Sequence, residues 1–171
     1  MTFTPSLVQP TMAARGLTLH QLDRLVRAFT NAERRWAPLV RYGTEDARWW
    51  TRLHADDAVD VWLLSWLPGQ LTDLHDHGSS SAAFVVARGR LEELRATRGG
   101  TSHSTVHEVG QSSWIPAGAV HDVRAVDQPS ISIHAYSPPL HRMTYYEPDP
   151  AHGLVVARTV ISDEPERREH P

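Results

Sequence analysis

The chain has 171 residues, a length that suits one domain with a single core. Its formal net charge is -3, so no basic field favours nucleic acid, and all 17 basic residues are arginine, which excludes a lysine Schiff base and a P-loop lysine. The chain has no cysteine, which excludes disulfides, thiolate metal sites and a cysteine nucleophile, whereas 11 histidines is a high count for this length.

The N-terminal part is expected to form a helical cap over residues 16–47, after an irregular arm at 1–15. Between residues 18 and 36 the apolar residues recur every three or four positions, which is the spacing of one helical face. Thr18 is the expected N-cap and Pro38 the expected stop, with a further helical turn at 44–47.

From residue 48 to 161 the sequence predicts an all-β barrel or sandwich. Segments rich in Val, Ile, Trp and Thr alternate with Gly, Pro, Ser and Asp breaks about every 8–12 residues. The expected strands are 59–67, 82–87, 91–97, 103–109, 112–115, 119–126, 131–136 and 154–161. The charged segment 162–171 is expected to be a mobile tail, so 1–171 is predicted to be a single domain.

The sequence shows no signal of export or membrane insertion. Residues 1–10 lack a basic patch followed by an apolar core, so no signal peptide is expected. The longest apolar stretch, 61–67, is far too short to span a bilayer. We therefore expect a cytoplasmic protein with no membrane and no nucleic-acid partner.

Two histidines separated by one residue are the strongest local signal. On a strand, His75 and His77 point to the same face, so their imidazoles can meet at one metal ion. A facial triad needs a third ligand, and His121, which follows a Pro-Gly turn, is the candidate. Two surface histidines on an exposed strand are the alternative.

A second pattern lies late in the chain. Ser132, His134 and Tyr136 alternate along one expected strand and so share a face. A hydroxyl, an imidazole and a phenol in line can form a hydrogen-bonded relay. The alternative is a strand whose polar residues face water.

The spacing around the three histidines resembles the two motifs of the cupin superfamily. The matching positions are Gly69, His75, His77 and Gly89 in the first motif and Gly110, Pro116, Gly118 and His121 in the second. The resemblance implies a double-stranded β-helix barrel, here with a helical N-terminal cap. Ala82 stands where cupins usually supply a glutamate ligand, so three neutral imidazoles would leave the full 2+ charge of a metal for exogenous anions.

With the Ser132–His134–Tyr136 row, the chain resembles the cysteine dioxygenase family over roughly residues 17 to 147. Trp50-Thr-Arg52 is similar to the family's Tyr-Thr-Arg, whose arginine grips the substrate carboxylate, although Trp50 replaces the tyrosine. Some members carry a cysteine crosslinked to the active-site tyrosine. That position is Ala82 here, so Tyr136 is expected to be a free phenol.

The resemblance implies a mononuclear non-haem iron enzyme that oxidises L-cysteine with O2 to cysteine sulfinic acid. Fe(II) would be bound by His75, His77 and His121. Arg52, with Trp50 beside it, would bind the carboxylate. Tyr136, oriented by His134 and Ser132, would donate a hydrogen bond to the substrate or to O2. The expected partners are a small thiol and O2, in a monomer or small homo-oligomer.

Three alternatives stay open. The first is the same chemistry on 3-mercaptopropionate or a larger thiol. Arg52 argues against 3-mercaptopropionate, because enzymes of that preference in the resembling family commonly have glutamine there. The second is a non-catalytic cupin that binds a metal or small ligand. The third is a zinc or nickel hydrolase or isomerase on the same three histidines, because the ligands do not identify the metal.

The other histidines and the tryptophans are expected to be structural. His103 and His107 lie about 13 Å apart if their segment is a strand, which favours a surface hairpin over a second metal site. The remaining histidines, expected at the surface or behind the site, are His20, His54, His141, His152 and His170. The tryptophans, among them Trp62, Trp66 and Trp114, are expected in the barrel core.

Overall fold

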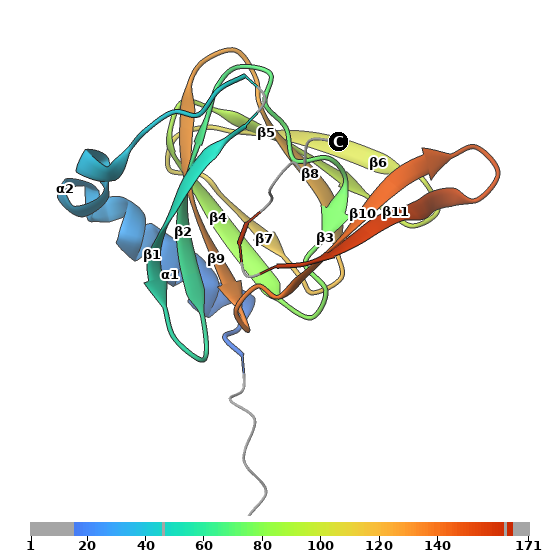
Figure 1. The fold of residues 1–171 in the computed structure, drawn as a ribbon, viewed down its shortest axis with the longest axis horizontal. Coiled ribbons are helices and arrows are strands. Elements are labelled where there is room, and N and C mark those ends of the chain that lie inside the picture. The colour runs from blue at the N-terminus through green and yellow to red at the C-terminus, as the bar shows by residue number, and fades with distance from the viewer. Residues whose placement is uncertain (1–15, 46, 163, 166–171) are drawn as a thin grey trace, which may run out of the picture.

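The computed structural model describes residues 16–45, 47–162 and 164–165, so the arm predicted at 1–15 lies outside the described residues. In this part of the chain, two short α-helices precede a series of strands that form two antiparallel sheets facing each other as a barrel (Figure 1). None of the described helices is long and apolar enough to cross a membrane.

The cap consists of α1 (Leu19–Asn31), α2 (Glu33–Trp36) and a 3-10 helix (Ala37–Leu39). Thr18 is the N-cap of α1, as predicted, and forms a capping box in which its side chain accepts from the backbone N–H of Gln21. The single predicted helix is interrupted at Ala32, whose backbone (ψ 42°) leaves the helical region. Pro38 lies inside the 3-10 helix.

Two sheets form the barrel. The five-stranded sheet has the order β1 (Trp49–Ala55), β2 (Asp60–Trp66), β9 (Ser130–Ser137), β4 (Ser81–Arg88) and β7 (Ser112–Ile115). The six-stranded sheet has the order β11 (Gly153–Ile161), β10 (Arg142–Asp149), β3 (His75–Asp76), β8 (Val120–Ala125), β5 (Leu91–Ala96) and β6 (Ser102–His107). The strands lie antiparallel to their neighbours in both sheets.

Strand alternation divides the core into two clusters. On β2, Trp62 and Trp66 face the barrel interior together with Tyr136 of β9. The alternate β2 residues, such as Leu63, face outward and pack in a second cluster with Leu22 and Val26 of α1. The five-stranded sheet is therefore buried on its inner face by the barrel core and on its outer face by the cap.

The eight predicted strands are confirmed within two residues at each end, but the helical turn predicted at 44–47 and the core position predicted for Trp114 are wrong. Residues 44–47 form no helical turn, because Thr44 and Ala47 pair in an isolated β-bridge. Trp114 is 42% exposed rather than in the core. On β7 the neighbouring Ser113 is buried, so alternation directs Trp114 outward, where its ring contacts His20 of α1 edge-on. Strand β10 was not predicted, since its buried run Met143–Tyr146 does not alternate.

Two positions of the predicted tail are described. The backbone N–H of Ser162 donates to the carbonyl of His141 at 3.0 Å, and Pro165 is buried. Residue 163 and residues 166–171 lie outside the described residues.

Candidate metal centre and active site

The three predicted metal ligands meet inside the barrel. His75 of β3 and His121 of β8 are direct cross-strand partners, and His77 follows two residues after His75. One ring nitrogen from each of the three lies within 4.8 Å of the others, and no ring is more than 2% exposed. The alternative of two surface histidines is therefore excluded.

Hydrogen bonds at the far side of two rings direct their Nε2 atoms toward the centre. The Nδ1 of His75 lies 2.8 Å from the carbonyl oxygen of Asp73, which accepts only if Nδ1 carries the proton. Asp73 has a left-handed φ of 64°, a conformation that aspartate tolerates better than most residues. The Nδ1 of His121 lies 2.9 Å from Oε1 of Glu93. The Nε2 atoms of His75 and His77 are 3.0 Å apart.

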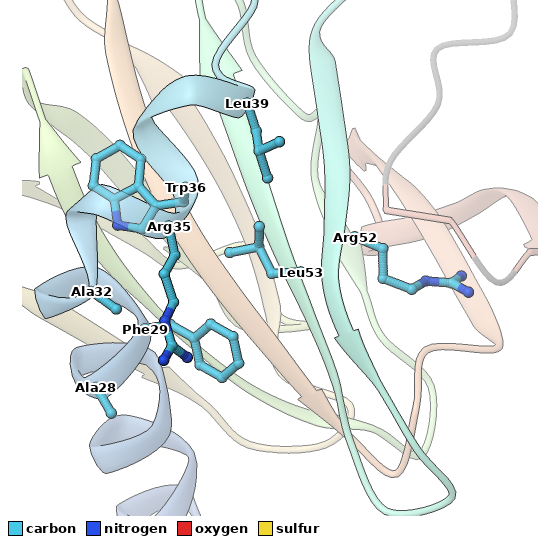
Figure 2. A pocket seen from close by; sticks show the side chains of 8 residues that line it. All are labelled: Ala28, Phe29, Ala32, Arg35, Trp36, Leu39, Arg52 and Leu53. Carbon is cyan, nitrogen blue, oxygen red and sulfur yellow. The ribbon is translucent and has the colours of Figure 1, made fainter.

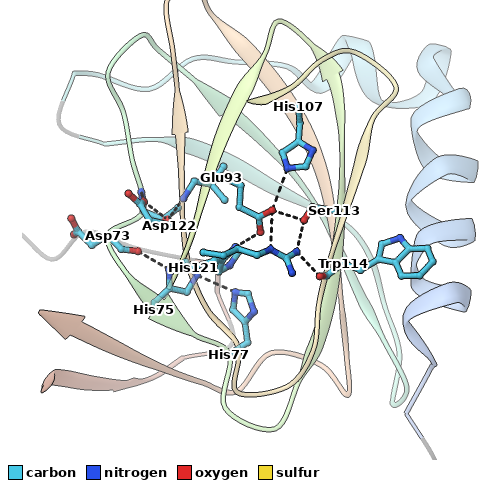
Figure 3. Close-up of polar contacts among 12 residues, drawn as sticks. Asp73, His75, His77, Glu93, His107, Ser113, Trp114, His121 and Asp122 are labelled. Carbon is cyan, nitrogen blue, oxygen red and sulfur yellow. Dashed lines mark hydrogen bonds and ion pairs between the residues drawn. The ribbon is translucent and has the colours of Figure 1, made fainter. Parts of the chain in front are cut away.

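Glu93, on β5, is a buried carboxylate behind His121 (Figure 3). Besides His121 it contacts Ser113, whose hydroxyl donates to Oε2 at 2.6 Å, and His107, whose Nε2 is 3.2 Å from the same oxygen. Arg95 Nε lies 3.2 Å from Oε2. Burial alone would raise the pKa of Glu93, but hydrogen bonds from His107, His121 and Ser113 outweigh it and hold that pKa well below its usual range. The side chain is therefore ionised.

Sequence reasoning missed Glu93 and misplaced His107. His103 is exposed as expected, but His107 is only 8% exposed and contacts both Glu93 and the ring of Phe84. Glu93 belongs to no motif. The one available signal is alternation along β5, where Leu91 and Glu93 share the buried face.

The Ser-His-Tyr row lies on the opposite wall of the barrel. Ser132, His134 and Tyr136 are all buried on the inner face of β9, so the alternative of a water-facing strand is excluded. The Nε1–H of Trp66 donates to Ser132 Oγ at 2.9 Å, and that oxygen is 2.8 Å from Nε2 of His134. The rings of His134 and Tyr136 are stacked with centroids 6.3 Å apart, and Tyr136 lies 4.9 Å from His77 by the same measure. The row thus ends at the histidine cluster.

Ala82 of β4 lies beside this row. It is the direct cross-strand partner of Tyr136 and is 1% exposed, within the same inner cluster. A methyl group at this position offers no sulfur to Tyr136, so no thioether can form between them.

Arg52 and Trp50 lie on β1, and both are associated with Trp62. The Cζ of Arg52 is 4.3 Å from the centroid of the Trp62 ring, which Trp50 meets edge-on at 5.2 Å. Because Trp62 belongs to the inner cluster, these contacts place Arg52 on the barrel side of β1. Figure 2 shows the Arg52 side chain pointing away from the helices of the cap.

Arg52 does not lie on the strand directly before the histidine strand. Strand β2 intervenes, because Asp56 forms a turn in which its Oδ1 accepts from the N–H groups of Ala58 and Val59. As a result β1 is an edge strand of the five-stranded sheet, whereas β3 lies in the other sheet.

Asp60 is a second buried carboxyl group that sequence reasoning missed. It is 2% exposed and is the cross-strand partner of Tyr136 on β9. Burial raises the pKa of Asp60, an effect opposed by the charge of Arg52. Asp60 therefore lies beside the end of the Ser-His-Tyr row on the five-stranded sheet.

A cavity of about 390 Å³ lies between the cap and β1 (Figure 2). Its lining is mostly apolar and comes from α1, α2 and β1: Ala28, Phe29, Ala32, Arg35, Trp36, Leu39, Arg52 and Leu53. Of the candidate site residues only Arg52 borders it, so this cavity is separate from the histidine cluster.

Comparison with known proteins identifies the family. The family model described as cysteine dioxygenase type I matches residues 7–149. The chain belongs to the cysteine dioxygenase type I family. As a member it is an oxidoreductase of the cupin type, and its buried histidine cluster is the candidate site of the metal.

Solved structures confirm the barrel. Protein TT1209 from Thermus thermophilus is similar with a TM-score of 0.53 and 22% identity, over 60% of this chain and 92% of that chain. A recombinant oxalate oxidase in complex with glycolate is similar with a TM-score of 0.52 and 18% identity, over 61% of this chain and 59% of the oxidase chain. A cupin 2 conserved barrel domain protein from Leptotrichia buccalis is similar with a TM-score of 0.50 and 21% identity, over 59% of this chain and 45% of that chain. At these identities the likeness shows the cupin fold of this cysteine dioxygenase family member and nothing further.

Proposed function

We propose that this protein is a mononuclear iron thiol dioxygenase that oxidises L-cysteine with O2 to cysteine sulfinic acid. The observation that carries the proposal is the meeting of three buried imidazoles with the end of the Ser132–His134–Tyr136 row, in a chain of the cysteine dioxygenase type I family. The reaction balances without a further reductant. Both atoms of O2 form bonds to the sulfur, the O–O bond breaks, and the sulfur loses four electrons to oxygen.

The donor set fits Fe(II). His75 and His121 each direct a nitrogen to one point, and both have acceptors for the opposite N–H group. Three imidazoles leave adjacent coordination positions for exogenous ligands, as a facial triad does. A ferrous ion bound there would supply the electron exchange through which O2 reacts with a thiolate. Ala82 at the usual cupin glutamate position favours a substrate that brings its own negative charge, and a thiolate does so.

The opposite wall would orient the substrate. The ring of Tyr136 lies against His77, so its phenol is near enough to the cluster to donate a hydrogen bond to a thiol bound there. His134 and Ser132 limit the movement of this wall, because they are linked to each other and to Trp66 by buried hydrogen bonds. All of these side chains are buried, which keeps bulk water from the reacting sulfur.

Arg52 would select for a carboxylate. A guanidinium pairs with a carboxylate through two parallel hydrogen bonds. The Cζ of Arg52 lies over the Trp62 ring at 4.3 Å from its centroid, and this contact limits the movement of the guanidinium. L-cysteine carries such a carboxylate next to its thiol, and cysteamine does not. The proposed partners are therefore a small thiol acid and O2.

The test is oxygen consumption by protein loaded with Fe(II) under anaerobic conditions. L-cysteine, cysteamine, 3-mercaptopropionate and a larger thiol are compared under identical conditions, and the products are identified. We expect the highest kcat/KM with L-cysteine, together with a stoichiometric sulfinate product. A higher value for 3-mercaptopropionate would reassign the substrate, and oxygen consumption that no thiol stimulates would contradict the proposal.

A further inference from the structure

The ligand set of the candidate metal centre brings no negative charge to a buried site. Imidazoles bind metals in their neutral form, and Ala82 replaces the glutamate that a cupin usually contributes. A divalent cation in a site of low dielectric constant is costly without an anionic partner nearby. The structure places the carboxylate of Glu93 directly behind one ligand, with the Nε atom of Arg95 3.2 Å from it on the other side.

The contact between Glu93 and His121 determines how the ring is presented. Oε1 of Glu93 is 2.9 Å from Nδ1 of His121, and both side chains are 2% exposed. A carboxylate only accepts hydrogen bonds, so this contact requires the proton on Nδ1 and leaves the Nε2 lone pair directed toward His75 and His77. A histidine that donates from Nδ1 to a carboxylate is also a more basic ligand at Nε2.

Glu93 is itself held in place by residues from both sheets (Figure 3). Ser113 of β7, in the five-stranded sheet, donates to Oε2 at 2.6 Å, and His107 of β6 approaches the same oxygen at 3.2 Å. Arg95 Nε lies 3.2 Å from it and a second Arg95 nitrogen donates to Ser113 Oγ at 2.7 Å. The carboxylate is unable to rotate away from His121 without breaking these contacts.

We infer that Glu93 is a positioning residue that orients His121 and supplies, through that ring, the negative charge that the three metal ligands lack, with Ser113 and His107 holding it in place. The inference rests on the proposed function to the extent that a divalent metal binds the three histidines. If Glu93 had a purely structural role, it would connect β5 to β7 through Ser113 and would not determine the tautomer of His121. The two roles therefore predict different measurements.

The first measurement is Fe(II) affinity, determined anaerobically by competition with a chelator and without thiol or O2. Glu93→Gln keeps the shape of the side chain and removes its charge, and we expect about 10–100-fold weaker Fe(II) binding. Glu92→Gln is the matched control, because this neighbouring carboxylate points to the other face of β5 and contacts Arg124. Its affinity should equal that of the wild type. Unchanged Fe(II) binding in Glu93→Gln would overturn the inference.

The second measurement is the tautomer of His121 in the metal-free protein, read from the ring nitrogen NMR signals at a pH where the imidazole is neutral. In the wild type we expect the proton on Nδ1. A glutamine at 93 can accept from or donate to that nitrogen, so Glu93→Gln should admit both tautomers. A wild-type ring protonated on Nε2 would overturn the inference even if Glu93→Gln does not fold. Ser113→Ala, which removes one contact to Glu93, should show a smaller loss of Fe(II) affinity.

The outcomes separate this inference from the proposed function. Normal oxidation of L-cysteine combined with unchanged Fe(II) affinity in Glu93→Gln would contradict only the role of Glu93. Weakened affinity in the variant, combined with a wild type that binds Fe(II) and oxidises no thiol, would contradict only the proposed reaction. A wild type that binds no Fe(II) would overturn both.

Discussion

The two walls of the barrel prepare the candidate site in different ways. The ligand wall, on the six-stranded sheet, carries His75 and His121 and is anchored by the charged carboxylate of Glu93. The relay wall, on the five-stranded sheet, carries Ser132, His134 and Tyr136, and hydrogen bonds join the hydroxyl of Ser132 to Trp66 and to the ring of His134. If the ligand wall binds the metal and the relay wall orients the substrate, the two roles rest on separate contacts. A substitution in one wall should then leave the role of the other wall intact.

The two walls also differ in how their backbone is supported. β9 is eight residues long and buried throughout, with partners on both sides and α1 against its outer face. β3 has only two residues, and its register comes from β8 and β10. The relay wall is therefore carried by a long strand paired on both sides, whereas His75 of the ligand wall lies on a strand of only two residues.

The largest effect on iron content and activity is expected when one of the three proposed metal ligands is removed. His121→Ala should remove most of the bound iron and all thiol oxidation, because a three-ligand site has no spare donor. His103→Ala is the control, since His103 is exposed on β6. Iron content by elemental analysis is the measurement. Full iron content in His121→Ala would show that His121 is no ligand and would remove the ligand wall from the account.

A smaller effect is expected for Arg52→Ala, which tests substrate selection on the relay side. Loss of a hydrogen-bonded charge costs about 1.5–3 kcal/mol, which is about a 10- to 100-fold fall in kcat/KM for L-cysteine. Cysteamine, which lacks a carboxylate, should be largely spared. Arg88→Ala is the control, because Arg88 stacks on Trp36 at the outer face. Equal losses on both substrates would contradict carboxylate binding by Arg52.

The smallest effect is expected for Tyr136→Phe, which removes one hydroxyl from the relay wall. Iron content should equal that of the wild type while kcat falls about tenfold, since the phenol contributes one hydrogen bond of about 1–1.5 kcal/mol. Tyr42→Phe, at an exposed position, is the control. Intact mass should show one unmodified form in both proteins. Loss of iron in Tyr136→Phe would mean that the two walls are not separable.

Local patterns predicted the parts of the fold and site that depend on local physics. The helical period and Thr18 placed the cap, and alternation placed Ser132, His134 and Tyr136 on one buried face. The histidine spacing and the Pro-Gly turn predicted that His75, His77 and His121 meet at one point, which the structure confirms. In each case residues close in sequence carry the signal.

The missed features depend on contacts between segments far apart in the chain. Glu93 and Ser113 are twenty residues apart and lie in different sheets, so neither one indicates the other from the sequence. His107 was expected in a surface hairpin. The rest of its strand is exposed, but the ring of His107 contacts the buried Glu93. The edge position of β1, which carries Arg52, likewise depends on its pairing with β2.

The central claim is that a thiol is oxidised by O2 where the two walls meet. Its most direct test is to supply the Fe(II)-loaded protein with L-cysteine and oxygen-18 gas in ordinary water, and to measure the product by mass spectrometry. The account predicts cysteine sulfinic acid in which both sulfinate oxygens come from O2. Cystine formation with release of peroxide, or a sulfinate whose oxygens come from water, would contradict it.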